Sequence, residues 1–534
     1  MVCGMTGKTM ANRLVLNACS TYGRLFVTFF LGLFSTWYIT KNLGLQGLGL
    51  VGLAAGSFGL SMALERGSDA AIGRELAEAI AKRDRRKISQ VSAATFAVCF
   101  LLGLLVVGVT LVLIPVILTG NLNLEMEGGN VQQAFSILLL CEGLAGALKI
   151  MGTVWRKACF ASRNILVDNV LMILERVGRP LVLLVVFEAL DAGGQISLVL
   201  LWIGLGTVVW SALYVAATAV VSRRLVPEVR FAKSDFNRSL VVQTIKNAAW
   251  ALQFSLVSGF LAQMLGLVVN LTLGLTFNGI WAIVIQLAGW CMLLSEGLFR
   301  GIDPLMIHLQ VERGVEGVRS RIPLLTSIQG YVAVAITGGM VCLSPWFLNV
   351  WLGERLQTVG QSSDLMTDGR SVLFLIANVL VLQLGGILVR STCTPLERTL
   401  FGLGHVRHYV PFVWVGGMVA VLVSCLPVTD GEFFWVPLGF LLANVCSYGI
   451  GVLRASARTI GLQISQDLQP SLVKVLIVGG ATWGYALMFR TSVDQTMISV
   501  GLTLLGLAVL WGAVVAATDR SIRTFVKRRT LASS

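Results

Sequence analysis

Charged side chains are scarce in this sequence. Asp, Glu, Lys and Arg together make up 13% of its 534 residues, whereas soluble domains average about 25%. Hydrophobic residues account for 56%, and the mean hydropathy is +0.81. A soluble fold of this composition would have too few polar groups to cover its surface. We therefore expect lipid to be the solvent for most of the chain.

The sequence also lacks the motifs of a metal site or a nucleophilic active site. Its 10 cysteines form no CxxC pair, and neither HExxH nor GxSxG occurs. We expect buried free thiols, no metal and no cofactor. For His405 and His408, near an expected helix end, an interfacial role is favoured over metal binding. No cleavable signal peptide is expected, because the apolar run from Leu14 is too long.

Continuous apolar runs, rather than the alternating pattern of a membrane barrel, fill the chain. Runs such as 96–118 and 198–221 are long enough to cross a bilayer as helices, which takes about 20 residues. Only helices and closed barrels satisfy their backbone groups in hydrocarbon, so the predicted fold class is an all-α polytopic membrane protein. Fourteen spans are predicted, at 14–39, 43–65, 90–118, 131–154, 165–188, 196–221, 247–272, 276–299, 322–349, 371–390, 406–427, 433–453, 471–489 and 496–517.

Lysine and arginine concentrate in alternate loops between these spans. The loop after the second span holds Arg74, Lys82, Arg83, Arg85, Arg86 and Lys87. The opposite loops hold only Lys41, Arg355, Arg370 and Arg490. An excess of Lys and Arg marks the cytoplasmic side, so both termini are predicted to be cytoplasmic. The net charge of +14 then requires no nucleic-acid partner.

The loops on the less basic side are all short. The longest covers 351–370, which leaves room for little more than a short helix. No extramembrane domain is therefore expected in which a soluble type of active site could form, and the protein is predicted not to be an enzyme.

A shift of 230 residues aligns the second span with the eighth. Leu43-Gly44-Leu45 falls on Leu273-Gly274-Leu275, and Gly49 falls on Gly279. An even number of spans separates the copies, which predicts two parallel six-helix halves and an appended helix pair. The predicted divisions are an N-terminal lobe at 1–222, a cytoplasmic linker at 223–246, a C-terminal lobe at 247–455, helices 13 and 14 at 456–517 and a basic tail at 518–534.

One glycine-rich stretch imitates a dinucleotide-binding motif. Residues 47–52 fit GxGxxG, but they lie inside an apolar span with no strand before them. Gly52 and Gly56 instead form a GxxxG step, a pattern that lets membrane helices pack closely. The pattern therefore predicts helix packing.

Charges inside the spans are costly in hydrocarbon unless they are paired or hydrated, which makes them functional candidates. The first half holds Arg24 in span one, Glu142 and Lys149 in span four, and Glu175, Arg176 and Arg179 in span five. Matching depths on antiparallel neighbours predict a Glu142–Arg176 pair. The i, i+4 spacing predicts a Glu175–Arg179 pair within span five. Lys149 is then left without a partner, or extends to the cytoplasmic surface.

These charges predict a hydrated cavity with cationic walls. Arginine suits phosphate, because its planar guanidinium makes bidentate hydrogen bonds. A purely structural role for the same ion pairs stays open. The second half is expected to lack comparable mid-span charges, apart from Arg300 and Asp303 near a cytoplasmic end.

Four short motifs surround the first two spans: Asn12-Arg13 before span one, a Leu-Gly-Leu turn into span two, Arg66-Gly67 at its end, and Arg74-Glu75-Leu76-Ala77 before the basic run. With its fourteen spans and its repeat, the chain resembles the polysaccharide-transporter branch of the multidrug/oligosaccharidyl-lipid/polysaccharide (MOP) flippase superfamily along nearly its whole length. The resemblance implies a MATE-like fold of two helical lobes that alternate between inward-open and outward-open states.

The resemblance also implies a cargo and a setting. The expected cargo is undecaprenyl-diphosphate-linked oligosaccharide, moved from the cytoplasmic to the periplasmic leaflet for O-antigen or exopolysaccharide biosynthesis. Arg24, Lys149, Arg176 and Arg179 are the expected substrate-binding residues, and Glu142 and Glu175 the expected ion-pair or coupling residues. Coupling to a proton gradient, a sodium gradient or the membrane potential stays open. We expect a monomer in the bacterial inner membrane, with membrane lipids and glycan-assembly proteins as partners.

Three alternatives stay open. A cation-coupled multidrug or metabolite exporter of the same superfamily usually has twelve spans and an acidic cavity. A glycan polymerase or glycosyltransferase usually needs a large outward loop or an acidic metal-binding segment, and neither is visible in the sequence. A flippase for the peptidoglycan precursor would share the fold.

Overall fold

The regular structure of this protein is helical. The computed structural model describes residues 7–57, 64, 76, 79–80, 82, 84–119, 131–162, 164–190, 196–230, 235–297, 302–359, 369–426, 433–492 and 495–519. These residues contain no strand, and the predicted all-α fold class is confirmed. Internal packing divides the chain into two compact units, 1–282 and 283–534, and α8 crosses the boundary between them.

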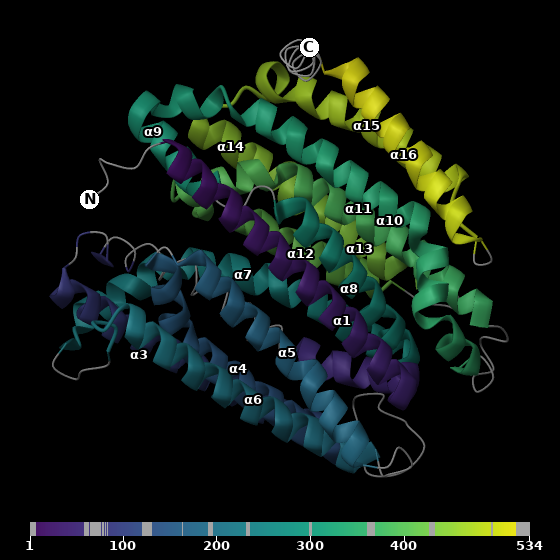
Figure 1. The fold of residues 1–534 in the computed structure, drawn as a ribbon, viewed down its shortest axis with the longest axis horizontal. Coiled ribbons are helices and arrows are strands. Elements are labelled where there is room, and N and C mark those ends of the chain that lie inside the picture. The colour runs from purple at the N-terminus through teal and green to yellow at the C-terminus, as the bar shows by residue number, and fades with distance from the viewer. Residues whose placement is uncertain are drawn as a thin grey trace. The chain divides into compact units, whose positions relative to one another are not determined.

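The first unit is a bundle of long helices. It contains α1 (Gly7–Ser57), α3 (Arg85–Leu118), α4 (Val131–Ala161), α5 (Ile165–Ala189), α6 (Ile196–Leu225), α7 (Arg238–Leu273) and the start of α8 (Leu275–Gly297). Helix α4 packs against both α3 and α6, and Figure 1 shows these three running side by side. Helix α5 contacts α1, α4 and α6. It is therefore the element through which the charged residues of this unit meet.

The second unit begins with the remainder of α8. Its other elements are α9 (Ile302–Arg319), α10 (Ile322–Val359), α11 (Gly369–Gly402), η2 (Val406–His408), α12 (Val410–Ser424), α13 (Trp435–Asn444), the π-helical η3 (Val445–Val452), α14 (Leu453–Ile460), the π-helical η4 (Ile464–Leu468), α15 (Gln469–Met488) and α16 (Met497–Thr518). Helical backbone occurs at each of the fourteen predicted spans. Among the described residues, 10 helices are long and apolar enough to cross a membrane, and α12 is a shorter apolar helix.

The predicted repeat is visible in the backbone. Gly44 breaks α1 with φ 69° and ψ −172°, and Gly274 separates α7 from α8 with φ 84° and ψ −177°. Positive φ favours glycine, because other residues place a Cβ too close to the backbone. The two glycines are 230 residues apart, as the aligned sequences predict. The two copies therefore bend in the same way at the same position.

The two copies also contact each other through glycines. A Cβ added at Gly49 would collide with the carbonyl oxygen of Leu275, and one added at Gly279 would collide with the carbonyl oxygen of Leu45. Each glycine thus meets the residue four positions before the other, which is the reciprocity of a two-fold contact. The Asn278 side chain donates to the carbonyl oxygen of Gly49 at 3.0 Å. This glycine crossing confirms the helix-packing interpretation of the GxGxxG stretch.

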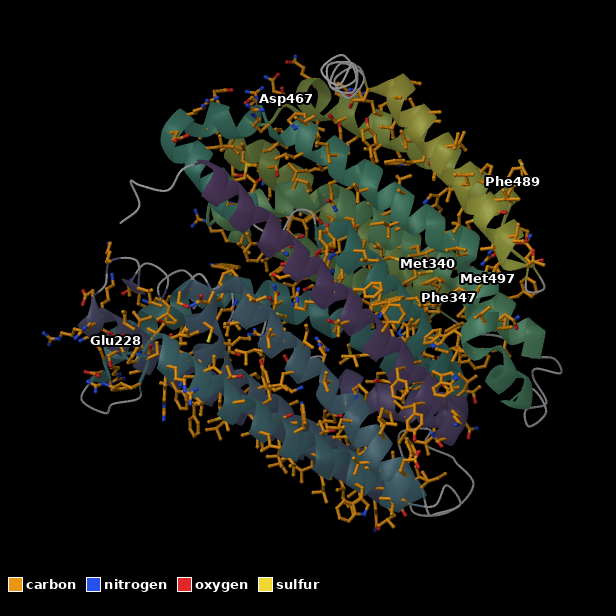
Figure 2. The ribbon with its side chains drawn as sticks, in the orientation of Figure 1. Glu228, Met340, Phe347, Asp467, Phe489 and Met497 are labelled. Carbon is orange, nitrogen blue, oxygen red and sulfur yellow. The ribbon has the colours of Figure 1, made fainter. Side chains whose placement is uncertain are left out.

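The last two helices are held on α10 in the second unit. At one end, Tyr331 donates to Asp519 at 3.2 Å, and Lys474 pairs with Asp519 at 3.6 Å. At the other end, Arg490 donates to Ser344 at 3.2 Å. Figure 2 shows Asp467 and Phe489 at the two ends of α15. Helices α15 and α16 are therefore attached to α10 at both ends.

Replacing Gly279 with alanine should lower the melting temperature of the purified full-length protein. The added methyl group meets backbone, which cannot move aside as a side chain can. Overpacking of this kind costs about 1–3 kcal/mol. Heating followed by fluorescence-detected size exclusion measures the change. G289A, on the same helix, is the matched control, because nothing lies within 4 Å of its added methyl group. Equal melting of G279A and G289A would show that the crossing tolerates bulk.

Candidate functional site

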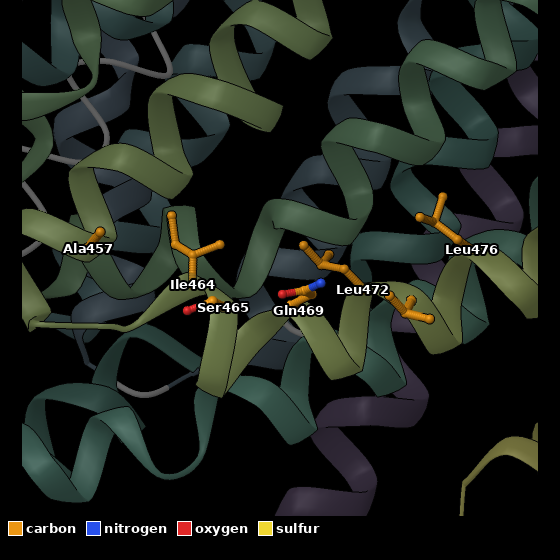
Figure 3. A pocket seen from close by; sticks show the side chains of 7 residues that line it. Ala457, Ile464, Ser465, Gln469, Leu472 and Leu476 are labelled. Carbon is orange, nitrogen blue, oxygen red and sulfur yellow. The ribbon is translucent and has the colours of Figure 1, made fainter.

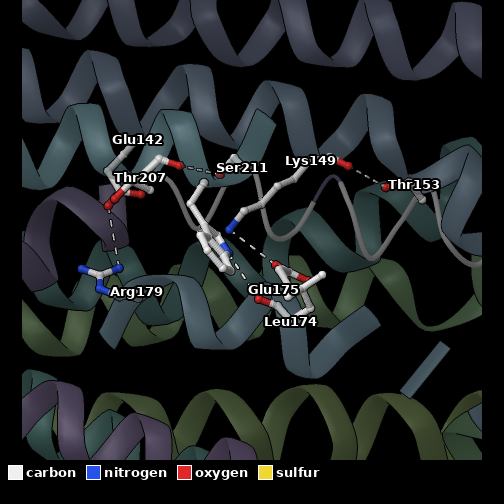
Figure 4. A network of polar contacts seen from close by, with 9 residues as sticks. Glu142, Lys149, Thr153, Leu174, Glu175, Arg179, Thr207 and Ser211 are labelled. Carbon is white, nitrogen blue, oxygen red and sulfur yellow. Dashed lines mark hydrogen bonds and ion pairs between the residues drawn. The ribbon is translucent and has the colours of Figure 1, made fainter. Parts of the chain in front are cut away.

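Two ion pairs join α4 to α5 in the first unit (Figure 4). Lys149 Nζ lies 3.4 Å from Glu175 Oε1, and Arg179 Nη1 lies 3.7 Å from Glu142 Oε1. The glutamate side chains are only 10% and 13% exposed. Residue numbers rise along α4 as they fall along α5, so the two helices are antiparallel, as predicted. Both carboxylates are therefore neutralised across this helix interface.

The predicted partners within this cluster were wrong. Glu142 pairs with Arg179 rather than Arg176, and Glu175 pairs with Lys149, which does not extend alone to the surface. Depth alone favoured Arg176, but Arg176 lies about 100° around the helix from Glu175 and is exposed. Glu175 and Arg179, one turn apart, share the face that meets α4. Their common face brings each to a partner on α4.

Helix α6 fixes α5 on another side. A Cβ at Gly178 would collide with the Trp210 ring, so glycine lets this indole lie directly against α5. Trp210 Nε1 then donates to the carbonyl oxygen of Leu174 at 3.2 Å. This contact lies beside Glu175 (Figure 4) and sets the rotation of α5 that points its charged residues toward α4.

Helix α1 lies along α5 in the same direction. Asn169 donates to Ser20 at 2.8 Å, and near the other end Tyr38 donates to Glu188 at 3.3 Å. Between these contacts, Arg24 is 4% exposed and its Nη1 lies 2.7 Å from the sulfur of Met172. Spans one and five are thus parallel, as expected for spans separated by an even number of crossings.

The six charges that the sequence singled out inside these spans do not balance. Arg24, Lys149, Arg176 and Arg179 are positive, and Glu142 and Glu175 are negative. Met172 and Arg176 are one turn apart on α5, so Arg24 and Arg176 approach the same stretch of that helix. We call these six residues the first-unit charge cluster. It carries two more positive than negative charges, and the cationic cavity that it would line stays a prediction.

The second unit contains a buried polar cluster that the sequence analysis missed. Arg390 Nε lies 3.8 Å from Glu296 Oε1, and its guanidinium lies 5.0 Å from the centre of the Tyr448 ring. Next to this pair in sequence, Ser295 and Ser391 share a hydrogen bond of 2.9 Å between α8 and α11. Glu397, also on α11, is 5% exposed. The expectation that this half lacks mid-span charges was therefore wrong.

This cluster had a visible signal in the sequence. Glu296 lies inside the predicted span 276–299, and Arg390 ends the predicted span 371–390. The predicted span ended at Arg390 because polar residues follow it, whereas helix α11 continues to Gly402. Of the two charges expected here, Arg300 lies outside the described residues, as does the side chain of Asp303.

Buried polar atoms in this cluster lack hydrogen bonds to the described residues. They are Glu296 Oε1, Arg390 Nε and the Tyr448 hydroxyl group. Unsatisfied buried polar groups are rare in folded proteins, because desolvation is costly when no hydrogen bond replaces water. Their concentration around one ion pair gives the second unit a chemically distinct candidate site.

The two neighbouring histidines lie at and just before the short helix η2, after the end of α11. His405 and His408 have ring centres 5.9 Å apart, and Arg407 Nε donates to His408 Nε2 at 3.3 Å. Partial burial, together with the nearby His408 and Arg407, lowers the pKa of His405. His405 is therefore neutral at pH 7, in keeping with a role at the end of α11.

The sequence matches no protein-family model and no curated protein. Solved structures do match. An inward-facing multidrug-resistance MATE transporter of the MOP superfamily aligns with a TM-score of 0.63 at 13% identity, over 82% of this chain and 98% of that one. The lipid II flippase MurJ, in an inward closed conformation, aligns with a TM-score of 0.64 at 11% identity, over 95% and 99%.

A MOP-superfamily transporter from Pyrococcus furiosus aligns with a TM-score of 0.59 at 13% identity, over 84% of this chain and 96% of that one. The chain has the MOP transporter fold. With its many apolar helices it is a multi-pass membrane protein. The polysaccharide-transporter branch of the MOP superfamily, predicted from the sequence, stays a prediction.

Replacing Lys149 with methionine should strongly destabilise the protein, because it leaves the nearly buried Glu175 carboxylate without its cation. Removing one partner of a buried pair costs roughly 3–5 kcal/mol. The double variant K149M/E175Q should recover most of the loss. Thermal unfolding of the four members of this double-mutant cycle measures the coupling. R176Q, on the exposed arc of α5, is the control and should melt like the parent. Additive losses in the double variant would contradict the pairing.

Proposed function

We propose that this protein is a flippase that moves undecaprenyl-diphosphate-linked oligosaccharide from the cytoplasmic to the periplasmic leaflet by alternating access, for O-antigen or exopolysaccharide biosynthesis. The observation that carries the proposal is the positive excess of the first-unit charge cluster. Positive charge inside apolar helices costs several kcal/mol unless a counter-charge or water meets it. An anionic cargo headgroup supplies a counter-charge to the exposed Arg176 during transport.

The roles within the cluster follow from their contacts. Lys149 and Arg179 neutralise the two glutamates, so they hold α4 and α5 in register and contribute less to the cargo. Arg176 is exposed, and Arg24 reaches the same stretch of α5. These two arginines are the proposed diphosphate ligands. Guanidinium groups suit that role, because each forms two parallel hydrogen bonds with phosphate oxygens.

The length of the chain supports a lipid-linked cargo over a drug. The MATE transporter is matched over 98% of its own length but covers only 82% of this chain, whereas the flippase MurJ covers 95%. The additional part of this chain that MurJ covers is similar in length to the region that contains α15 and α16. Apolar side chains cover the outer face of that pair, with Leu476 and Ile498 among the most exposed.

Replacing Arg176 with glutamine should slow translocation about tenfold or more, because a hydrogen bond to a charged group contributes about 1.5–3 kcal/mol. The assay uses proteoliposomes containing a fluorescent undecaprenyl-diphosphate sugar and measures how fast the label becomes inaccessible to an external quencher. R24Q should give the same result, provided that it elutes as a folded protein. R223Q removes an exposed arginine from the last turn of α6 and should transport normally. Normal transport by R24Q and R176Q would refute the proposal.

The polar cluster of the second unit favours a second candidate, a cation-coupled multidrug or metabolite exporter. Buried carboxylates such as Glu397 are the groups that bind protons or cations inside a membrane. In cells that lack their own efflux pumps, an exporter would raise resistance to cationic dyes. That resistance would disappear on neutralising Glu397 or Glu142 and would survive R176Q. We expect expression of the protein to confer no such resistance, and a resistance with this pattern would favour the exporter.

A further inference from the structure

The repeat places a proline at the same position in two long helices. Pro115 lies inside α3 and Pro345 lies inside α10, 230 residues apart, like the paired glycines. A proline has no backbone N–H, so it leaves the carbonyl group four residues before it without its helical donor. Sharp bends in helices occur at such positions. The two copies therefore share one place at which the helix can bend.

In the second unit, this place on α10 is closed by hydrogen bonds. Ser344 Oγ donates to the carbonyl oxygen of Val341, which Pro345 leaves without its helical donor, at 3.2 Å. The next carbonyl oxygen, that of Cys342, accepts from the backbone N–H and the hydroxyl group of Thr491 at 3.0 and 2.8 Å. The segment around the proline is thus bonded both within itself and to the loop between α15 and α16.

Arg490, the residue before Thr491, ties the same loop to two helices. Its Nη2 donates to Ser344 on α10 at 3.2 Å, and its Nη1 donates to Asn378 on α11 at 2.6 Å. We call the contacts of Arg490 and Thr491 with these two helices the loop brace. Because the brace joins α10 to α11 and to the loop, α10 cannot bend here without breaking hydrogen bonds.

Helix α15, which carries this loop, is packed on α10 along one side only. Thr482 lies against Gly338 of α10. Leu472 and Leu476 lie on another side of α15, where they line a groove of ≈ 600 Å³ next to α14 (Figure 3). The helix that positions the brace is therefore held by α10 itself, the helix whose bending the brace opposes.

The equivalent part of α3 in the first unit lacks the side chains of the brace. Ser344 corresponds to Ile114, which has no hydroxyl group to donate to the carbonyl group that Pro115 leaves without a donor. Asn378 on α11 corresponds to Leu148 on α4, which offers no side-chain acceptor. The polar residues of the loop brace therefore occur in only one of the two copies.

The surface before each proline differs in the same way. Leu111 and Val112 on α3 are 53% and 71% exposed. Their counterparts on α10, Val341 and Cys342, are both 0% exposed. In a membrane, the exposed side of α3 meets lipid, which moves aside when a helix bends, whereas the covered side of α10 meets the rest of its own unit.

We propose that the loop brace is a conformational device that keeps α10 from bending at Pro345, while α3 bends at Pro115. The appended pair α15 and α16 then serves to make one copy of the repeat rigid at a position where the other copy is a hinge. Shape changes at this end of the two helices are confined to the first unit. This inference involves no cargo and does not rest on the flippase proposal.

Hydrogen exchange of the full-length protein in lipid nanodiscs, followed by mass spectrometry, tests the proposal, because exchange reports local opening of helical hydrogen bonds. We expect the amides of 111–118 in α3 to be protected about tenfold less than those of 341–348 in α10. The double variant R490Q/T491V should lower the protection of 341–348 about tenfold and leave 111–118 unchanged, because it removes bonds only from α10. S492A alters the next, exposed residue of the loop and is the matched control, which should exchange like the parent.

Two proline variants separate a hinge from general loosening of the helices. P115A supplies the missing N–H and should raise the protection of 111–118. P345A does the same for α10, which then no longer depends on the brace, so adding R490Q/T491V to P345A should change its protection little. The proposal is overturned by equal protection of the two segments in the parent, by unchanged exchange in R490Q/T491V or P115A, or by an equal loss with and without P345A. None of these results bears on the flippase proposal, which rests on Arg24 and Arg176.

Discussion

A charge inside hydrocarbon must meet a counter-charge or water, and this requirement organises the protein. In the first unit it joins α4 to α5 through Glu142–Arg179 and Lys149–Glu175. In the second unit it joins α8 to α11 through Glu296 and Arg390. Apolar side chains pack against many neighbours with similar energies, particularly where lipid is as apolar as the helix. A charged side chain, in contrast, has one partner at one depth in the membrane. The ion pairs therefore fix one register between helices whose apolar surfaces would allow several registers.

The features predicted correctly from the sequence are those that depend on local pattern. Apolar run lengths placed the helices, and the glycine alignment of the repeat placed equivalent bends at Gly44 and Gly274. That Gly49 and Gly279 meet at a crossing was seen only in the structure. Partner choice within the charge cluster depends on how far each helix is rotated, which hydropathy does not encode. Helix ends were also missed where polarity rises before the helix stops. Arg156 is buried on α4 beyond the predicted end of span four, and Glu397 is buried on α11 beyond the span predicted to end at Arg390.

The repeat preserves geometry but not charge. The two copies share the glycine bend and meet through reciprocal backbone contacts, since any side chain at the crossing would force the helices apart. Their titratable groups differ. The first-unit cluster carries excess positive charge, whereas in the second unit Glu296 pairs with Arg390, and Glu397 lies about two turns further along the same face of α11. Backbone contacts constrain both copies equally, and the in-span charges are free to diverge.

This asymmetry bears on how one fold accommodates different cargoes. The glycine crossing and the docking of α15 and α16 on α10 involve no residue of the first-unit charge cluster. Under the proposed function, a few substitutions on α1, α4 and α5 would reverse the sign of the charge that a cargo meets without altering the helix framework. Each such change must keep the glutamate pairs intact, because an unpaired buried carboxylate destabilises the interface that positions the remaining arginines. The proposed cargo ligands Arg24 and Arg176 take no part in these two glutamate pairs, so a change of either would leave both carboxylates paired.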